Sequence, residues 1–344
     1  MATKITFKPK QVTKRLLAVL PERARDVVIS RYGLDKTPER MTLESIGQTY
    51  KITRERVRQI ENYSFASIRK SPAYEKEKLV FDELEKIVKG LGGVVSEKEL
   101  LKNITTDQST QNHIHFLLVV GSAFKKRKED EHFEHRWYID ENLLDKVEDS
   151  LKSLYGSLSD EDLIPEAEMV TSFLDKVRDI SEEYKNQEVA KRWLNLSKKM
   201  GRNPLGEWGV SHSPNVRAKG MRDFAYLAIR RHGSPMHFTE VAKAIQELFD
   251  RRAHVATCHN ELIKDKRFVL VGRGLYALAE WGYASGVVKE VIKDIIKKYG
   301  PLTKDEIVDK VMKERYVKEN TIMVNLQNPK YFKKSKDGKY TSAV

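Results

Sequence analysis

A twenty-residue pattern that occurs twice constrains the fold of this chain more than any other feature. Residues 257–276, TCHNELIKDKRFVLVGRGLY, align without a gap with residues 321–340, TIMVNLQNPKYFKKSKDGKY. A helix, a strand, a tight glycine turn and a returning strand would produce this spacing. The repeat therefore predicts two copies of one module. The residues shared by the two copies are Leu262, Phe268, Gly274 and Tyr276, and Leu326, Phe332, Gly338 and Tyr340.

Two further helices precede the repeat in each copy. Amphipathic helices are expected over RDFAYLAIRRH and VVKEVIKDIIKKY, and each leads through a glycine to a threonine that can cap a second helix, Thr239 or Thr303. Three helices followed by a two-stranded wing form a winged helix. A looser third copy starts at LVFDELEKIVKGLGG, with Ser96 as its cap and a longer, charged wing. We expect winged-helix modules at residues 78–142, 216–282 and 284–344, with the last two joined at GYASG, residues 282–286.

Nearer the N-terminus, MTLESIGQTYKITRERVRQIE (residues 41–61) has the pattern of two short helices joined by a turn. Thr42 and Thr53 are suitable N-caps for these helices. The apolar residues would pack together across the turn, which predicts a helix-turn-helix within residues 1–72. These apolar residues are Leu43, Ile46, Ile52, Val57 and Ile60.

Four polar residues of the second helix, Arg54, Glu55, Arg58 and Gln59, are spaced so that they share one face opposite its apolar side. A solvated amphipathic helix would also place charges there. Arginine, glutamine and glutamate, however, are side chains whose planar ends match base edges in the major groove. The spacing therefore favours base readout by these four residues.

Residues 143–215 have helical periodicity followed by a loop rich in glycine, proline and serine. Between residues 140 and 188 there are 15 Asp/Glu against 5 Lys/Arg. We expect an acidic helical connector here. The fold class predicted for the chain is therefore mainly α: an N-terminal helix-turn-helix domain, about three winged-helix (α+β) modules and this connector.

The net charge of +13 is unevenly distributed. Residues 1–72 carry 16 Lys/Arg against 7 Asp/Glu, residues 73–215 carry 21 against 28, and residues 216–344 carry 26 against 15. Basic ends suit a polyanion such as double-stranded DNA. The single Cys258 excludes a disulfide framework. A membrane-spanning helix needs about 18 apolar residues in a row, and no apolar run in this sequence approaches that length. We therefore expect a cytoplasmic protein with no membrane contact.

Residues 12–70 resemble region four of the primary bacterial sigma factors, through LPERARDVVISRYGL and MTLESIGQTYKITRERVRQIE. The resemblance implies that the second helix enters the major groove of the minus thirty-five promoter element. It places Arg54, Glu55, Arg58 and Gln59 on the bases. Arg56 is better placed for a phosphate or a structural contact, and Thr53 is a further candidate for a phosphate contact. It also implies RNA polymerase core as a partner.

Two departures limit that resemblance. After QIE the family usually continues as AKALRKLR, a stretch that meets polymerase and activators, whereas this chain continues as NYSFASIRK. Nothing here resembles the aromatic-rich helix that melts the minus ten element, and only about eleven residues precede the matching segment. A complete promoter-opening sigma factor is therefore not expected.

Residues 216–282 resemble the HARE-type winged helix, through GSPMHFTEVAKAI and RFVLVGRGLYALAEWGY. This module is found in the delta subunit of some bacterial RNA polymerases and in some restriction and chromatin proteins. Its third helix and wing would supply phosphate contacts from Lys264, Lys266 and Arg267, and FKKRKED in the first wing is a similar candidate. Winged helices also bind proteins, so both partners stay open.

Catalysis is not indicated, because no nucleophile–base arrangement or phosphate loop stands out. The spacing of EVAK is that of some nucleases but lacks a partner acid, and four histidines with H-x-H and H-x2-H spacing lack cysteine ligands. Charged surface histidines are favoured over a metal site. We expect no enzyme activity, no cofactor and no metal. The four histidines are His113, His115, His132 and His135.

These observations predict a DNA-binding transcription protein that is sigma-factor-like and associates with RNA polymerase. Two alternatives stay open. One is a polymerase-binding accessory protein like the delta subunit, and the other is the DNA-recognition component of a restriction or repair system.

Overall fold

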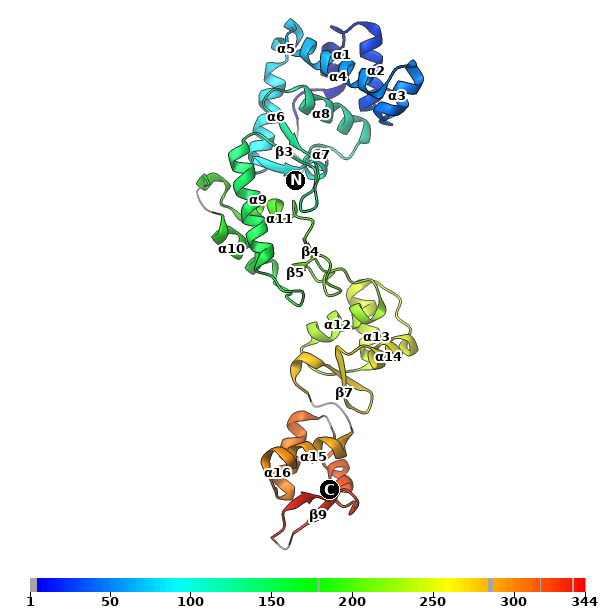
Figure 1. The fold of residues 1–344 in the computed structure, drawn as a ribbon, viewed down its shortest axis with the longest axis vertical. Coiled ribbons are helices and arrows are strands. Elements are labelled where there is room, and N and C mark those ends of the chain that lie inside the picture. The colour runs from blue at the N-terminus through cyan, green and yellow to red at the C-terminus, as the bar shows by residue number, and fades with distance from the viewer. Residues whose placement is uncertain (1–4, 178–179, 284–286, 316, 336, 344) are drawn as a thin grey trace. The chain divides into compact units, whose positions relative to one another are not determined.

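The computed structural model describes residues 5–177, 180–283, 287–315, 317–335 and 337–343. They form two compact units (Figure 1). The first comprises residues up to 201 together with 208–211, and the second comprises 202–207 and the residues from 212 onward. Helices dominate both units and the strands are short, which confirms the predicted mainly α fold class.

The first unit begins with four helices that form the head of the molecule. Apolar residues of α3 and α4, Ile46 and Val57, are fully buried together with Val27 of α2. The Thr42 and Thr53 hydroxyls cap α3 and α4 by accepting hydrogen bonds at 3.1 Å from the Ser45 and Arg56 amides. The predicted helix-turn-helix is therefore formed. The helices are α1 (Pro9–Leu17), α2 (Glu22–Tyr32), α3 (Leu43–Tyr50) and α4 (Arg54–Arg69).

The turn between α3 and α4 requires a close backbone approach at Gly47. A Cβ atom at this position would lie 2.7 Å from the Ile52 carbonyl oxygen, which is well inside van der Waals contact. The Ile52 amide donates to the Gly47 carbonyl at 2.9 Å, so the two backbones are in direct contact. Glycine therefore sets the angle at which α4 leaves the turn.

A winged helix follows the head. Its sheet has the order β1-β3-β2 with antiparallel pairing, and Val94 lies opposite Tyr138. Ser96 caps α7, as predicted, by accepting from the Glu99 amide at 3.1 Å. The elements are α5 (Pro72–Lys76), α6 (Lys78–Gly90), β1 (Val94–Ser96), α7 (Glu97–Ile104), α8 (Gln108–Val120), β2 (Lys125–Arg127) and β3 (Arg136–Tyr138).

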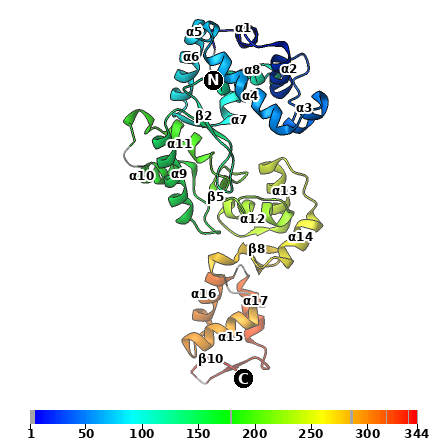
Figure 2. The same ribbon diagram turned by 45° about the horizontal axis from the view of Figure 1, so that its top comes forward.

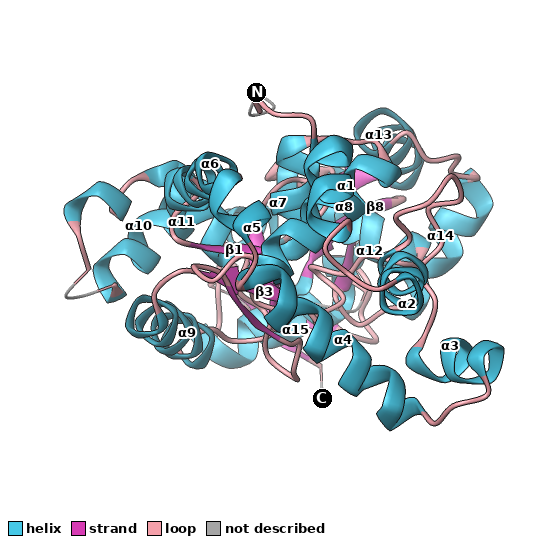
Figure 3. Ribbon diagram, turned by 90° about the horizontal axis from the view of Figure 1, so that it is seen from above, coloured by secondary structure: helices cyan, strands magenta, loops and turns pink. Residues whose placement is uncertain are grey.

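One hydrophobic core is shared by the head and this winged helix. The third helix of the winged helix, α8, contacts α1, α2 and α4 (Figure 3). Phe116 and Leu117 of α8 are fully buried in the same cluster as Leu16 of α1 and Ile68 of α4. The predicted boundary near residue 72 therefore separates two folds but not two hydrophobic cores.

The acidic residues after the winged helix form helices that also pack against the preceding winged helix, a contact that the expected connector does not imply. Phe173 and Trp193 are fully buried and pack with Val94 and Tyr138 of the preceding sheet. Figure 2 shows the helices α9, α10 and α11 grouped beside the first winged helix. Most of the charged side chains lie on the outer face, with Glu148 of α9 a buried exception, so the composition hid an apolar inner face. The elements are α9 (Glu141–Gly156), α10 (Glu166–Lys176), η1 (Glu182–Tyr184), α11 (Gln187–Leu194), β4 (Met200–Arg202) and β5 (Trp208–Val210).

The second unit contains the two copies of the repeat. In each copy three helices precede two antiparallel strands, and the repeated leucine, phenylalanine and tyrosine are buried. The repeated glycines, Gly274 and Gly338, have φ angles of 74° and 79°, which favour glycine at the wing turn. The predicted junction at GYASG falls largely on residues 284–286, outside the described residues.

The first copy adds a short third strand, so that its sheet has the order β6-β8-β7. Its elements are α12 (Met221–His232), β6 (Met236–His237), α13 (Phe238–Phe249), α14 (Val255–Lys264), β7 (Phe268–Gly272), β8 (Leu275–Leu278) and η2 (Ala279–Trp281). The second copy has α15 (Val288–Tyr299), α16 (Lys304–Glu314), α17 (Glu319–Leu326), β9 (Phe332–Lys334) and β10 (Tyr340–Ser342).

Candidate nucleic-acid interface

The first two turns of α4 present a polar face to solvent. Arg54, Glu55, Arg58 and Gln59 are all exposed there, while Val57 on the opposite side is fully buried. The structure therefore brings the four predicted residues together on one surface of one helix. This surface lies at the N-terminal end of α4, where a helix entering a groove makes its base contacts.

Two pairs of side chains organise this face. The Arg58 guanidinium donates to both carboxylate oxygens of Glu55, at 2.7 and 2.9 Å. The hydrogen bond from Arg58 lowers the pKa of Glu55, so this carboxylate stays ionised. Arg56 donates from Nη1 to Gln59 Oε1 at 3.0 Å. The Gln59 side chain also hydrogen-bonds to Glu55 and helps to lower the pKa of that carboxylate. Arg54 makes no side-chain hydrogen bond or ion pair among the described residues.

A groove of about 600 Å³ runs beside the polar face, between the N-terminal end of α2 and α4. Arg23 and Arg56 both line it, together with the exposed ring of Tyr63. Two guanidinium groups next to a helix face can bind an anion such as a backbone phosphate. Thr53 lies at the start of this face, where its hydroxyl oxygen already caps α4.

Comparison with known proteins identifies the head. Residues 16–70 match the family described as Sigma-70, region 4. The N-terminal head contains a Sigma-70 region 4 domain. RNA polymerase sigma factor RpoS of Coxiella burnetii is 54% identical over 48 residues, which are 14% of this chain and 13% of that protein. Sigma factor SigA1 of Synechococcus elongatus is 48% identical over 54 residues, 16% of this chain and 13% of that protein.

These matches cover a small part of each protein. Sigma factor SigA of Nostoc sp. is similarly 46% identical over 56 residues, 16% of this chain and 14% of that protein. The chain therefore spans about one seventh or less of the length of these curated relatives. The family match ends at residue 70, so the winged-helix modules lie outside it.

The segment of α4 that departs from the sigma pattern has a structural role in this chain. Phe65 and Ile68 from NYSFASIRK are buried in the shared core. Arg69 donates to the backbone carbonyls of Val119 and Val120, both at 2.8 Å, and so caps the C-terminal end of α8. The region 4 domain is therefore attached to the winged helix through NYSFASIRK. This is the stretch for which the sigma resemblance implies contacts with polymerase and activators.

The third helix of the first winged helix is not available for DNA, because α8 is buried from Asn112 onward between the region 4 domain and the rest of its own module. His113 and His115 lie on α8, and burial lowers the pKa of both, so they are not the charged surface histidines expected from sequence. No group of three or more potential metal ligands is found among the described residues.

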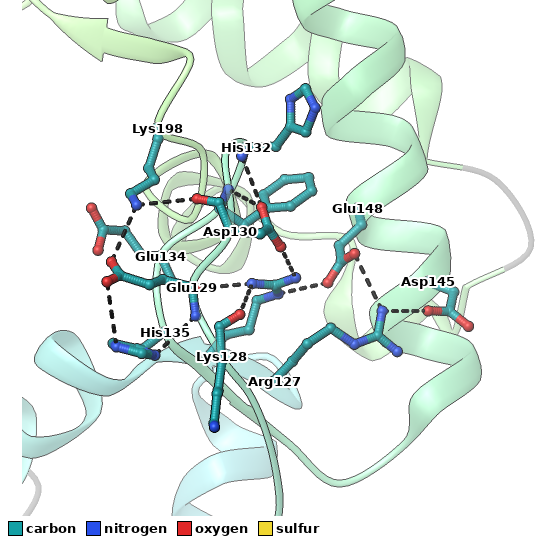
Figure 4. Close-up of polar contacts among 12 residues, drawn as sticks. Arg127, Lys128, Glu129, Asp130, His132, Glu134, His135, Asp145, Glu148 and Lys198 are labelled. Carbon is teal, nitrogen blue, oxygen red and sulfur yellow. Dashed lines mark hydrogen bonds and ion pairs between the residues drawn. The ribbon is translucent and has the colours of Figure 1, made fainter.

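Three of the four basic residues of FKKRKED pair with acidic side chains, whereas Lys128 is exposed, so most of this segment is already engaged within the protein. Lys126 pairs with Glu97 at 2.5 Å. Arg127 pairs with Asp145 at 2.8 Å and with Glu148 at 3.3 Å, both on α9 (Figure 4). The pairs of Arg127 thereby fasten α9 to the wing.

At the centre of this network is a fully buried arginine that the sequence did not reveal. Arg136 donates from Nε to Glu148 at 2.6 Å and from Nη2 to Asp130 at 2.9 Å. Its Nη1 donates to the carbonyls of Lys128 and Glu134. The sequence RWY gives no signal that its arginine is buried. The carboxylate that pairs with Arg136 belongs to Glu148 on α9, and local sequence does not show that α9 packs on this strand.

In the second unit, one of the three predicted phosphate contacts is already engaged. Arg267 donates to Asp223 at 2.9 Å and to Asp265 at 2.7 Å, and also to the Asn215 side chain. Lys264 and Lys266 are exposed instead. Of the three residues, therefore, only these two lysines present a free cation to solvent. Among the described residues, no helix is both long and apolar enough to cross a membrane.

Proposed function

We propose that this protein binds promoter-type DNA by inserting the N-terminal half of α4 into the major groove. The observation that carries the proposal is the exposed face of Arg54, Glu55, Arg58 and Gln59 on a Sigma-70 region 4 domain. Arginine can donate two hydrogen bonds to guanine, glutamine can pair with adenine, and glutamate can accept from cytosine. The face therefore offers complementary groups for a short, specific sequence.

Phosphate contacts would fix the register of α4 in the groove. Arg56 and Arg23 line the groove beside the reading face. Thr53 lies at the start of the reading face, where it caps α4. Such contacts position a protein on DNA without reading its sequence. We assign Arg56 and Thr53 to this role.

Association with RNA polymerase core is the second part of the proposal, supported by the relatives, which are RNA polymerase sigma factors. The C-terminal half of α4 is packed against α8, so a polymerase contact would have to use another surface of this chain. Co-purification of the full chain with polymerase core tests this part separately from DNA binding. In this reading the chain works in transcription in the cytoplasm, without catalysis.

Substitution of the reading residues tests the DNA proposal. We expect Arg58→Ala and Gln59→Ala each to weaken binding to the preferred site by about 1–3 kcal/mol and to relax preference at one or two base pairs. The preferred site comes from an unbiased selection at fixed salt, and affinities come from fluorescence anisotropy. Gln187→Ala, an exposed helical glutamine far along the chain from α4, is the control. Parent-like binding of both variants to every sequence would refute base readout by α4.

The winged helix at residues 216–282 has two candidate roles. Lys264 and Lys266 suit phosphate contacts that add affinity without specificity. The exposed face of α14 also carries Ile263 and Val255, which are 62% and 42% exposed, and this apolar character favours protein docking like that of the polymerase delta subunit. The HARE-type resemblance agrees with either role, and a place in restriction or repair has no further support.

Salt dependence separates these roles. If both lysines contact phosphates, Lys264→Ala/Lys266→Ala should flatten the slope of log K against log salt by about 1.8, because each contact contributes about 0.9. Binding should weaken similarly on all sequences. Lys98→Ala/Lys102→Ala, which removes two exposed lysines from α7, is the control. An unchanged slope together with loss of polymerase capture would favour the docking role.

A further inference from the structure

The polar face of α4 continues one turn beyond the four predicted residues. Asn62 follows Arg58 by four positions and Glu55 by seven, so at 3.6 residues per turn it lies within about 40° of the first and about 20° of the second around the helix axis. Its side chain is exposed. Asn62 is therefore in line with the reading face and about 6 Å further along the axis than Arg58.

The Asn62 amide has no partner among the described residues, unlike its neighbours on the face. Glu55 is held by Arg58, and the Gln59 oxygen is held by Arg56. Asn62 therefore keeps both its acceptor oxygen and its donor N–H groups for a ligand. The next exposed position on this side, Ala66, has no polar side-chain atom, so the face ends at Asn62.

We propose that Asn62 is a fifth base-reading residue, specific for adenine, and this inference rests on the proposed function of α4. Asparagine can donate to adenine N7 and accept from its N6 amino group at the same time. A shift of about 6 Å along the helix corresponds to one or two base-pair steps beyond the pair that Arg58 reads. The sigma resemblance leads one to expect AKALRKLR after QIE, with alanine at the position of Asn62. An adenine contact by Asn62 would therefore distinguish this chain from proteins with that pattern.

The first experiment compares sites selected by the full chain and by Asn62→Ala at the same salt concentration. We expect the parent site to include an A·T pair at one edge and the variant to lose that preference alone. Discrimination at this pair should fall by about 5- to 150-fold, which is the factor that 1–3 kcal/mol represents. Asn142→Ala, an exposed helical asparagine on α9, is the control and should leave all preferences unchanged.

The second experiment identifies the contacting atom. Replacing the edge adenine with 7-deazaadenine removes the N7 acceptor. It should weaken binding of the parent and of Asn142→Ala but not of Asn62→Ala, which is the non-additivity expected of a direct contact. Circular dichroism checks that each variant keeps the helix content of the parent.

The outcomes distinguish the inference from the proposal on which it rests. If the parent selects a motif that Arg58→Ala changes, but Asn62→Ala leaves every position unchanged, Asn62 is merely solvated and the inference is overturned. The proposed function survives in that case. If the parent selects no motif at all, the proposed function fails, and readout by Asn62 fails with it.

Discussion

Phe116→Ala is expected to destabilise the region 4 domain and the first winged helix together, by about 3–5 kcal/mol. The Phe116 ring is fully buried on α8, with its centroid 5.8 Å from that of Tyr32 on α2 and 6.5 Å from that of Phe65 on α4. Truncation would leave a cavity at the centre of the core that the two folds share. Hydrogen exchange should show amides of α2, α4 and α6 losing protection in parallel.

Phe173→Ala is a matched control, because Phe173 is also fully buried but belongs to the separate cluster formed by the acidic helices. We expect that substitution to affect α9 to α11 more than α2 and α4. If Phe116→Ala removes protection from α6 and α7 while α2 and α4 keep theirs, the region 4 domain is an independent unit and the shared core has no cooperative role.

Glu148→Ala should cost about 3 kcal/mol of unfolding free energy, because it leaves the Arg136 guanidinium buried with Asp130 as its remaining carboxylate partner. The double substitution Arg136→Met/Glu148→Leu removes both buried charges and should recover most of that loss. Urea unfolding followed by tryptophan fluorescence measures all three proteins.

Asp145→Ala is the control for this prediction. Asp145 also pairs with a basic residue of the wing, Arg127, but its side chain is 55% exposed, so removing it should cost less than about 1 kcal/mol. If Asp145→Ala and Glu148→Ala lower the free energy of unfolding by the same amount, burial does not increase the cost of breaking the Arg136–Glu148 pair.

Local features of the structure could be predicted because they depend on neighbouring residues. Thr42, Thr53 and Ser96 each cap the expected helix, and the repeated wing glycines adopt the expected positive φ angles. The helical spacing also placed the four polar residues of α4 on one exposed face. These patterns need only the geometry of a single helix or hairpin.

The partners of each element could not be predicted in the same way. Periodicity shows which face of a helix is buried but not what covers it, so the packing of α8 on the head and of α9 on the wing was missed. One signal was present: HIHFLLVV in α8 is largely apolar around the whole helix, which is typical of a helix buried on all sides. No comparable signal marks Arg136.

The shared core also has a consequence for the order in which the chain can fold during synthesis. Leu16 and Leu17 of α1 pack in the same cluster as Leu117 and Val120 of α8, about one hundred residues later in the chain. On a ribosome adding about 5–20 residues per second, the residues that complete the interior of the head follow about 5–20 seconds later. A chain interrupted before α8 would leave α4 without its support, so truncated products would lack a properly held recognition helix.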